Sequence, residues 1–301
     1  MPQKALSLTY AKLVAAMFFW GGTWIAGRVI AQEVSAPLGI AALRFVVTAL
    51  VLAGAVLFSG QALPRLQTSR EWGVVCGLGF FGIFLYGLCF FYGLQHISAG
   101  RGALVVALNP VVIVIAAWLF GQERMNRRKA LGSAIALAGC LTVIGNGNAL
   151  ALIQGTVGLG EWLIIGCVLS WAAYTFIGRQ ATKTLSPLAT TLYGSLVGAL
   201  FLGIAALIQG DVAPVSWSWR VWAGMFFLAI FGTAIAYTWF TEAVHQLGAG
   251  HASVFINLVP VFAVLQAALL LDERLGLSVL FGGLLVIAGV WLTTQQKNFW
   301  R

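Results

Sequence analysis

Long apolar segments recur along the whole chain and restrict its fold more than any other feature. Apolar residues make up 60% and charged residues 8% of the 301 residues, whereas about a quarter of a soluble domain is charged. A bilayer core about 30 Å thick needs roughly 20 helical residues to cross it. Ten segments suit such a crossing: 8–30, 38–59, 72–94, 100–120, 130–145, 158–178, 188–209, 219–241, 250–271 and 277–294.

These segments are expected to be helices, because lipid offers backbone amides no hydrogen-bond partner. Strands of a membrane barrel would alternate apolar and polar residues over about ten positions. Segments such as 104–120 are instead apolar on every face. The sequence therefore predicts an all-α integral membrane protein with ten transmembrane helices.

The second half of the sequence repeats the first at a fixed interval. Three pairs of prolines are separated by 150 residues: Pro37 and Pro187, Pro64 and Pro214, and Pro110 and Pro260. We expect two five-helix repeats, residues 1–150 and 151–301, within one membrane domain. Because five crossings are an odd number, the second repeat should enter the membrane from the opposite side. Inverted repeats of this kind are common in secondary transporters.

The net charge of +9 is distributed so that it orients the helices. Basic residues gather between alternate segments, most densely in ERMNRRK at 123–129. The positive-inside rule then predicts a multi-pass protein of the cell membrane, the inner membrane in a bacterium, with both termini cytoplasmic. The charge does not indicate a nucleic-acid partner, and membrane lipid is the expected surrounding.

Metal and cofactor sites are not expected. The cysteines lie inside apolar segments without a metal-ligand spacing, and we interpret them as small buried residues: Cys76, Cys89, Cys140 and Cys167. Glu242, His245 and His251 gather at the ends of two segments, but Glu242 and His245 have no counterpart pair in the first half, which disfavours a metal site. A proton relay and solvated helix ends both remain open for them.

Two equivalent segments carry a family resemblance. GALVVALNPVVIVIAAWLFGQER and HASVFINLVPVFAVLQAALLLDER each combine small residues, a mid-helix proline and a glutamate thirteen positions later. With FFWGGTWIAGR and ALRF in the first two segments, they make almost the whole chain resemble ten-helix EamA-type exporters of the drug/metabolite transporter superfamily. The resemblance implies a secondary transporter of small metabolites, and aromatic amino-acid exporters are the most similar members in overall character.

Candidate substrate-binding residues are aromatic or amide side chains at mid-span depth. The aromatic ones are Trp20, Trp24, Tyr86, Phe90, Trp171, Tyr174 and Tyr237. Those three or four residues apart share a helix face. Core packing explains any single one, whereas the group together also suits a cavity lined by stacking surfaces.

Prolines, amides and one arginine complete the candidate positions. Pro110 and Pro260 should bend their helices, either as packing kinks or to line a pathway. Asn109 and Asn257 should face the protein, through an interhelical hydrogen bond or by substrate contact. For Arg44, six residues into its segment, we expect a side chain that reaches the outer surface, with binding of a substrate carboxylate as the alternative.

Small residues occur at helical spacing on the two last segments of the repeats. They are Gly132, Ala136, Gly139, Gly282, Gly283 and Gly289. Close helix packing at such residues suits either the internal scaffold or a dimer contact. The chain is therefore expected to be a monomer or a homodimer.

A secondary exporter accounts for the duplication, the inversion and the absence of a GxxxxGK[ST] phosphate loop. An intramembrane enzyme would need paired metal ligands or an activated nucleophile, and we expect none. We expect alternating access at a central cavity that moves a small-molecule substrate, an aromatic or apolar amino acid. One alternative is that the substrate is another metabolite or a drug. The other is that the protein is a non-transporting receptor or a structural protein. Energy coupling stays open between proton exchange and movement down a gradient.

Overall fold

The computed structural model describes residues 3–59, 65–120, 125–144, 147, 157–181, 185–210, 217–247, 255–273 and 276–294. The regular elements in these ranges are helices, which confirms the all-α prediction. They are α1 (Gln3–Glu33), α2 (Leu38–Ser59), α3 (Ser69–Gly77), η1 (Leu78–Leu85), α4 (Tyr86–His96), α5 (Ala99–Val106), α6 (Asn109–Leu119), α7 (Arg127–Ile144), α9 (Leu159–Ala181), α10 (Pro187–Gln209), α11 (Trp219–Phe226), η3 (Phe227–Ile235), α12 (Ala236–Leu247), α14 (Leu258–Leu270) and α15 (Leu277–Thr294).

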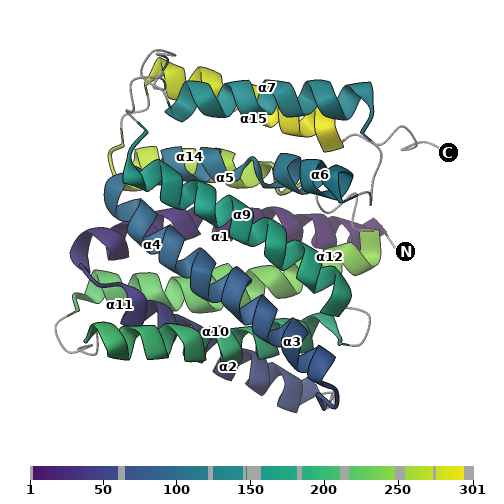
Figure 1. Cartoon of the computed structure of the whole chain (residues 1–301), viewed down its shortest axis with the longest axis vertical. Helices are drawn as coiled ribbons and strands as arrows, with labels where there is room; N and C mark the ends of the chain where they lie inside the picture. The colour runs from purple at the N-terminus through teal and green to yellow at the C-terminus, as the bar shows by residue number, and fades with distance from the viewer. Residues whose placement is uncertain are drawn as a thin grey trace.

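The helices occupy the ten predicted positions, and α2 and α15 coincide with predicted segments at both ends. Within the described residues, seven helical stretches are long and apolar enough to cross a membrane, and α14 and α15 are shorter apolar helices. α7 begins with three basic residues, which lowers its mean hydropathy. In Figure 1, α1 begins on the right-hand side of the bundle, the side on which α15 ends, whereas α9, the first helix of the second half, begins on the left-hand side.

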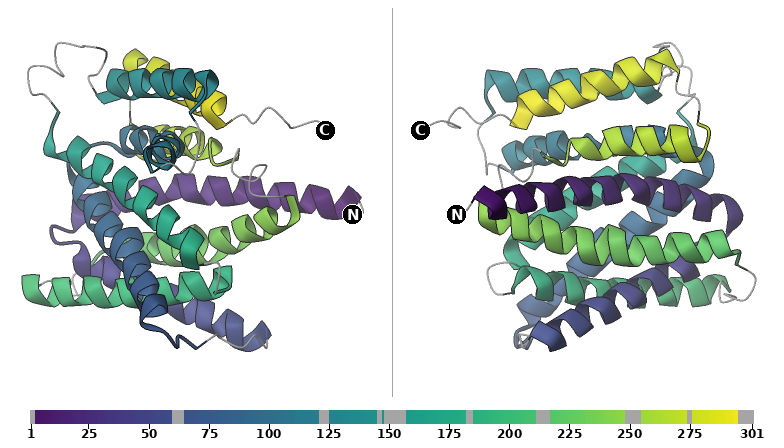
Figure 2. Two further views of the ribbon diagram at one scale, coloured as in Figure 1. Left: turned by 45° about the vertical axis from the view of Figure 1, so that its right-hand side comes forward. Right: turned by 180° about the vertical axis from the view of Figure 1, so that it is seen from behind.

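The two halves of the chain interlock. α2 packs on its equivalent α10, and α7 packs on its equivalent α15. Helix α1 packs on α12 and α14, while its equivalent α9 packs on α4, α5 and α6. Exchanging the halves maps the packing of α1 on α12 and α14 onto the packing of α9 on α4 and α6. In Figures 1 and 2, the α7–α15 pair lies at one end of the long axis, and α2 and α10 lie towards the other.

Helices α7 and α15 meet along the predicted small residues. A Cβ atom built on Gly139 would lie 2.6 Å from the carbonyl oxygen of Gly282. One built on Gly289 would lie 2.4 Å from the backbone nitrogen of Ala136. Only hydrogen atoms fit between these backbones. The small residues therefore form a contact within one chain.

Both repeats contain a π-helical segment at the equivalent place in their third span, η1 and η3. Such segments are frequent at functional sites, and they interrupt the regular i→i−4 hydrogen bonding. In η3, the Thr233 hydroxyl donates to the carbonyl of Leu228 at 2.8 Å, and Nε1 of Trp20 donates to the carbonyl of Gly232 at 3.0 Å. Side chains thus reach backbone oxygens of η3 in the middle of the bundle.

Three cysteines are buried as predicted, Cys89, Cys140 and Cys167. The prediction is wrong for Cys76, which is exposed. Its neighbour Val75 is completely buried, and consecutive helical residues point about 100° apart. Helix α3 therefore packs through the face that carries Val75 and leaves Cys76 outside.

Candidate functional site

Aromatic side chains of α4 and α9 form a continuous cluster in the bundle. The ring centroid of Tyr86 lies 5.9 Å from that of Trp171 and 6.0 Å from that of Phe90, and the rings of Trp171 and Tyr174 lie 5.2 Å apart. These separations are typical of favourable ring contacts. A Cβ atom on Gly82 would lie 2.2 Å from Cδ2 of Tyr174, so the Tyr174 ring packs directly on the backbone of η1.

A second group of rings, from α1 and α12, adjoins the first. The centroid of Trp20 lies 5.3 Å from that of Tyr237 and 5.2 Å from that of Phe240. Tyr237 is near enough to interact electrostatically with Tyr174 and with Tyr86. The phenols that interact in this way come from three helices, two of them from the second repeat.

The half-buried rings among the predicted site residues are called the central aromatic group below; they are Trp20, Tyr86, Trp171, Tyr174 and Tyr237. The other predicted aromatics, Trp24 and Phe90, are each 3% exposed, and their ring centroids lie 5.1 Å apart. A Cβ atom on Gly102 would lie 2.8 Å from the Trp24 ring, and one on Gly27 would lie 2.4 Å from the Phe90 ring. Trp24 and Phe90 therefore pack beneath the group and support it.

Arg44 of α2 points towards the same region. Its Nη2 donates to the Thr233 hydroxyl at 3.1 Å, and its guanidinium lies 4.7 Å from the ring centroid of Phe45. It is also near enough to Tyr86 and Tyr237 to interact electrostatically. The expectation that Arg44 reaches the outer surface is wrong, because its side chain bonds to the mid-span segment η3.

A sequence signal for the direction of Arg44 lies four residues further on. The Thr48 hydroxyl donates to the carbonyls of Arg44 at 3.0 Å and of Ala229 at 3.3 Å. Two polar residues with i, i+4 spacing share a helix face, and polar side chains in membrane helices usually face protein. The pair Arg44 and Thr48 therefore identifies the face of α2 that packs on η3.

The predicted prolines lie just after interruptions of their helices. Asn109 is the first residue of α6, and Pro110 follows it. In the second repeat, Asn257 is the N-cap residue of α14, and Pro260 lies in the first turn. Oδ1 of Asn109 is buried and has no hydrogen-bond partner. The expected interhelical hydrogen bond is therefore not made by this oxygen.

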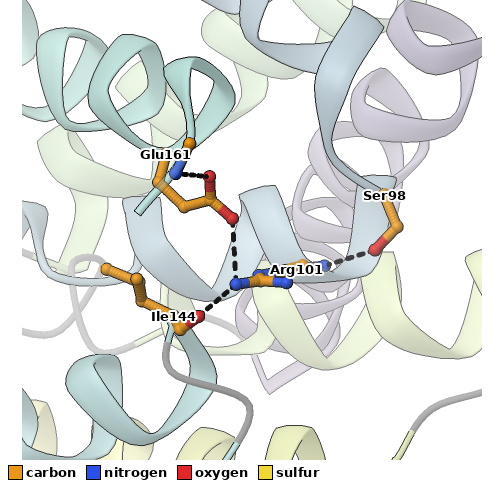
Figure 3. Close-up of polar contacts among 5 residues, drawn as sticks. Ser98, Arg101, Ile144 and Glu161 are labelled. Carbon is orange, nitrogen blue, oxygen red and sulfur yellow. Dashed lines mark hydrogen bonds and ion pairs between the residues drawn. The ribbon is translucent and has the colours of Figure 1, made fainter. Parts of the chain in front are cut away.

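Polar contacts that involve both repeats gather on the side of the bundle opposite the start of α1. In Figure 3, Glu161 of α9 points at Arg101 of α5, with Nη2 and Oε1 2.9 Å apart. Arg101 also donates to the carbonyl of Ile144, the last residue of α7. Glu273, beyond α14, accepts a hydrogen bond from the backbone nitrogen of Ala99 at 2.9 Å. Two carboxylates of the second repeat thus hold the start of α5.

One described ion pair joins the repeats at the other end. Lys12 of α1 lies 2.9 Å from a carboxylate oxygen of Glu242 of α12. The side chains of His245 and His251, which the sequence places near Glu242, lie outside the described residues. Among the side chains that the structure describes, no group of three could hold a metal ion.

An all-helical membrane bundle of two interlocked repeats, with interrupted helices and polar side chains at its centre, is common among membrane transporters. The chain belongs to the EamA-like transporter family, which matches residues 7–145 and 158–295 separately. The family is thus present once in each half of the chain. The EamA family belongs to the drug/metabolite transporter superfamily, as the sequence motifs predicted.

Similar proteins support this membership. "Uncharacterized transporter YyaM" of Bacillus subtilis is 30% identical over 284 residues, which is 93% of this chain and 92% of the relative. A "Probable terminal-alkyne amino-acid exporter" of Streptantibioticus cattleyicolor is 26% identical over 294 residues, 97% of this chain and 95% of the relative. A solved crystal structure matches with a TM-score of 0.65 and 22% identity, covering 94% of this chain and 97% of the other. The latter shows the fold alone.

Proposed function

We propose that this protein is a secondary exporter that carries an aromatic or apolar amino acid across the cytoplasmic membrane. The observation that carries the proposal is the central aromatic group, whose rings come from α1 and α4 of the first repeat and from α9 and α12 of the second. Half-buried rings offer faces on which a flat apolar solute can stack. The amino-acid exporter among the similar proteins adds support for the substrate class.

The mechanism that we propose is alternating access between two inverted repeats, residues 1–150 and 151–301. In this mechanism, the contacts of Arg101 with Glu161 and of Glu273 with α5 would form the closed gate at one end of the pathway. Transport would require these contacts to open while the other end, near Lys12 and Glu242, closes. Because α7 and α15 are in backbone contact, we propose that this pair stays together and that the helices bend at the interruptions before Pro110 and Pro260.

Solute counterflow tests this function directly. Proteoliposomes that contain purified protein and unlabelled phenylalanine should accumulate labelled phenylalanine faster than liposomes without protein. Unlabelled phenylalanine should compete better than a small polar amino acid such as serine. A receptor or a structural protein would show no counterflow with any solute, and that result would reject the proposal.

Variants of the central aromatic group refine this test. Trp171→Ala removes ring contacts with Tyr86 and Tyr174 and should lower phenylalanine counterflow more than that of a smaller transported solute. Trp219→Ala is the matched control, because the Trp219 side chain is 75% exposed. Trp222 is less suitable as a control, since its ring centroid lies 5.4 Å from that of Trp217.

Cysteine labelling tests the proposed orientation. In a background in which the exposed Cys76 is replaced by alanine, cysteines at Arg127 and Lys183 should react only from the cytoplasmic side. Cysteines at Gln154 and Asp211 should react only from outside, because an odd number of crossings, five and seven, precedes these two positions. Labelling of Arg127 and Gln154 from the same side would contradict the inverted topology.

A further inference from the structure

Arg44 carries a positive charge in the middle of the bundle and forms no ion pair with any described residue. The described carboxylates lie near helix ends instead: Glu33, Glu71, Glu161, Glu242, Asp272 and Glu273. A charge within a membrane span is costly without a partner, and a functional role is its default explanation. Among the described residues, Arg44 therefore has no anionic partner of the kind that its position calls for.

The polar groups around Arg44 leave hydrogen-bonding capacity for such an anion. The hydrogen bond of its guanidinium is made by Nη2 to the neutral hydroxyl of Thr233, and its Nε is buried without a partner. The Phe45 ring lies over the guanidinium and so restricts its orientation. Tyr86 and Tyr237, which are close enough to interact with it electrostatically, have hydroxyls that can donate hydrogen bonds to an anion.

The chemistry of the guanidinium fits a carboxylate. Its planar fork of N–H donors matches two carboxylate oxygens, and the hydrogen bonds of such a charged pair are stronger than neutral ones. The rings of Tyr86 and Tyr237 belong to the central aromatic group, so an anion at Arg44 would lie beside surfaces suited to an apolar group. A solute with a carboxylate next to a flat ring satisfies both features.

We propose that Arg44 binds the carboxylate of the transported solute while the central aromatic group binds its side chain. This assignment rests on the proposed function and deepens it. It makes Arg44 a specificity-determining residue that selects carboxylic acids and rejects the corresponding amines. During transport, the solute carboxylate would pair with the guanidinium. The hydrogen bond from Nη2 to the Thr233 hydroxyl would either remain or be replaced by one to the carboxylate.

A purely structural role of Arg44, which would attach α2 to η3, makes a different prediction. A structural arginine would affect all solutes alike when it is replaced. A carboxylate-binding arginine changes the preference between solutes that differ only in their carboxylate. Thr233→Val separates the roles further, because it removes the hydrogen bond of Arg44 to η3 and leaves the charge in place.

The experiment measures competition against labelled phenylalanine in counterflow. The competitors are 3-phenylpropionate, which has the carboxylate and lacks the amine, and phenylethylamine, which has the amine and lacks the carboxylate. In the unmodified protein, 3-phenylpropionate should compete and phenylethylamine should not. This comparison needs no variant, and equal competition by both compounds would overturn the assignment.

Variants then locate the selectivity at Arg44. Arg44→Gln removes the charged donor, and the loss of hydrogen bonds to a charged group should lower the kcat/KM of phenylalanine transport by roughly 10- to 100-fold. Phenylethylamine should become the better competitor in Arg44→Gln. Arg44→Lys should keep part of the preference for the acid, and Thr233→Val should keep most of it. Arg220→Gln is the control, because Arg220 is exposed at the start of α11.

The outcomes distinguish this inference from the proposed function. Phenylalanine counterflow by the unmodified protein, with an unchanged acid-to-amine preference in Arg44→Gln, would overturn the role of Arg44 alone. Absence of counterflow with every aromatic amino acid would reject the proposed function and this inference together. Stronger competition by phenyl phosphate than by 3-phenylpropionate would replace the carboxylate with a phosphate as the anion.

Discussion

Replacing Gly82 by alanine should displace Tyr174 and disturb the central aromatic group. The added Cβ would lie 2.2 Å from Cδ2 of Tyr174, whereas non-bonded carbons settle about 3.5–4.0 Å apart. The Tyr174 ring must therefore move by more than about 1 Å. Insertion of a methyl group into a packed site costs about 1–3 kcal/mol, and the higher helix propensity of alanine offsets about 1 kcal/mol.

The effect on transport follows from the ring contact between Tyr174 and Trp171, whose centroids lie 5.2 Å apart. A pair of this kind is worth about 0.5–1.5 kcal/mol, which corresponds to roughly a 2- to 13-fold change in an equilibrium constant. We expect Gly82→Ala to raise the KM for phenylalanine within this range. Counterflow gives the KM, and thermal unfolding in detergent shows separately whether the variant has lost stability.

Two comparisons make this prediction decisive. Gly203→Ala is the matched control, because no atom lies within 4 Å of its added Cβ. In a Tyr174→Ala background, the ring that the new methyl group would strike is absent, so Gly82→Ala should add little further loss. Equal losses in both backgrounds, or no difference from Gly203→Ala, would refute the assigned contact.

Two further changes test the packing and the ion pairs. Gly139→Leu should prevent recovery of monodisperse protein, because its Cβ would lie 2.6 Å from a backbone oxygen of α15. Gly54→Leu is the control: its Cβ has nothing within 4 Å, so this variant should elute normally from a size-exclusion column. Glu161→Gln should lower the free energy of unfolding by about 1–3 kcal/mol, because the Glu161 side chain is only 7% exposed. Glu242→Gln should lower it by less than about 1 kcal/mol, because the Glu242 side chain is 36% exposed. Equal losses in thermal unfolding would contradict this burial argument.

The sequence was sufficient for most of the architecture because membrane crossing imposes a strong constraint on composition. The segments 38–59 and 277–294 coincide with α2 and α15. The π-helical segments were not predictable from apolar periodicity, because a run such as LGFFGIFL is apolar on every face. Their geometry depends on packing against other helices, for example of Gly82 on Tyr174.

The candidate site was only partly accessible from sequence. Depth along the spans selected aromatic residues that the structure brings together, such as Tyr86 and Trp171. Depth alone did not distinguish half-buried rings from the packed pair Trp24 and Phe90, because that difference depends on neighbouring glycines. The direction of Arg44 was mistaken because its position near the start of a span allowed two directions, and its bond to Thr233 depends on how the repeats pack.

The position of a bound solute tests the central claim most directly. Crystals grown with 4-bromophenylalanine, after counterflow has shown that the protein carries it, would locate the bromine by anomalous diffraction. We expect the bromine beside the rings of Tyr86, Trp171 or Tyr237 and the carboxylate of the solute at the Arg44 guanidinium. A fully occupied bromine site away from the central aromatic group, with no density for a solute near Arg44, would contradict the account.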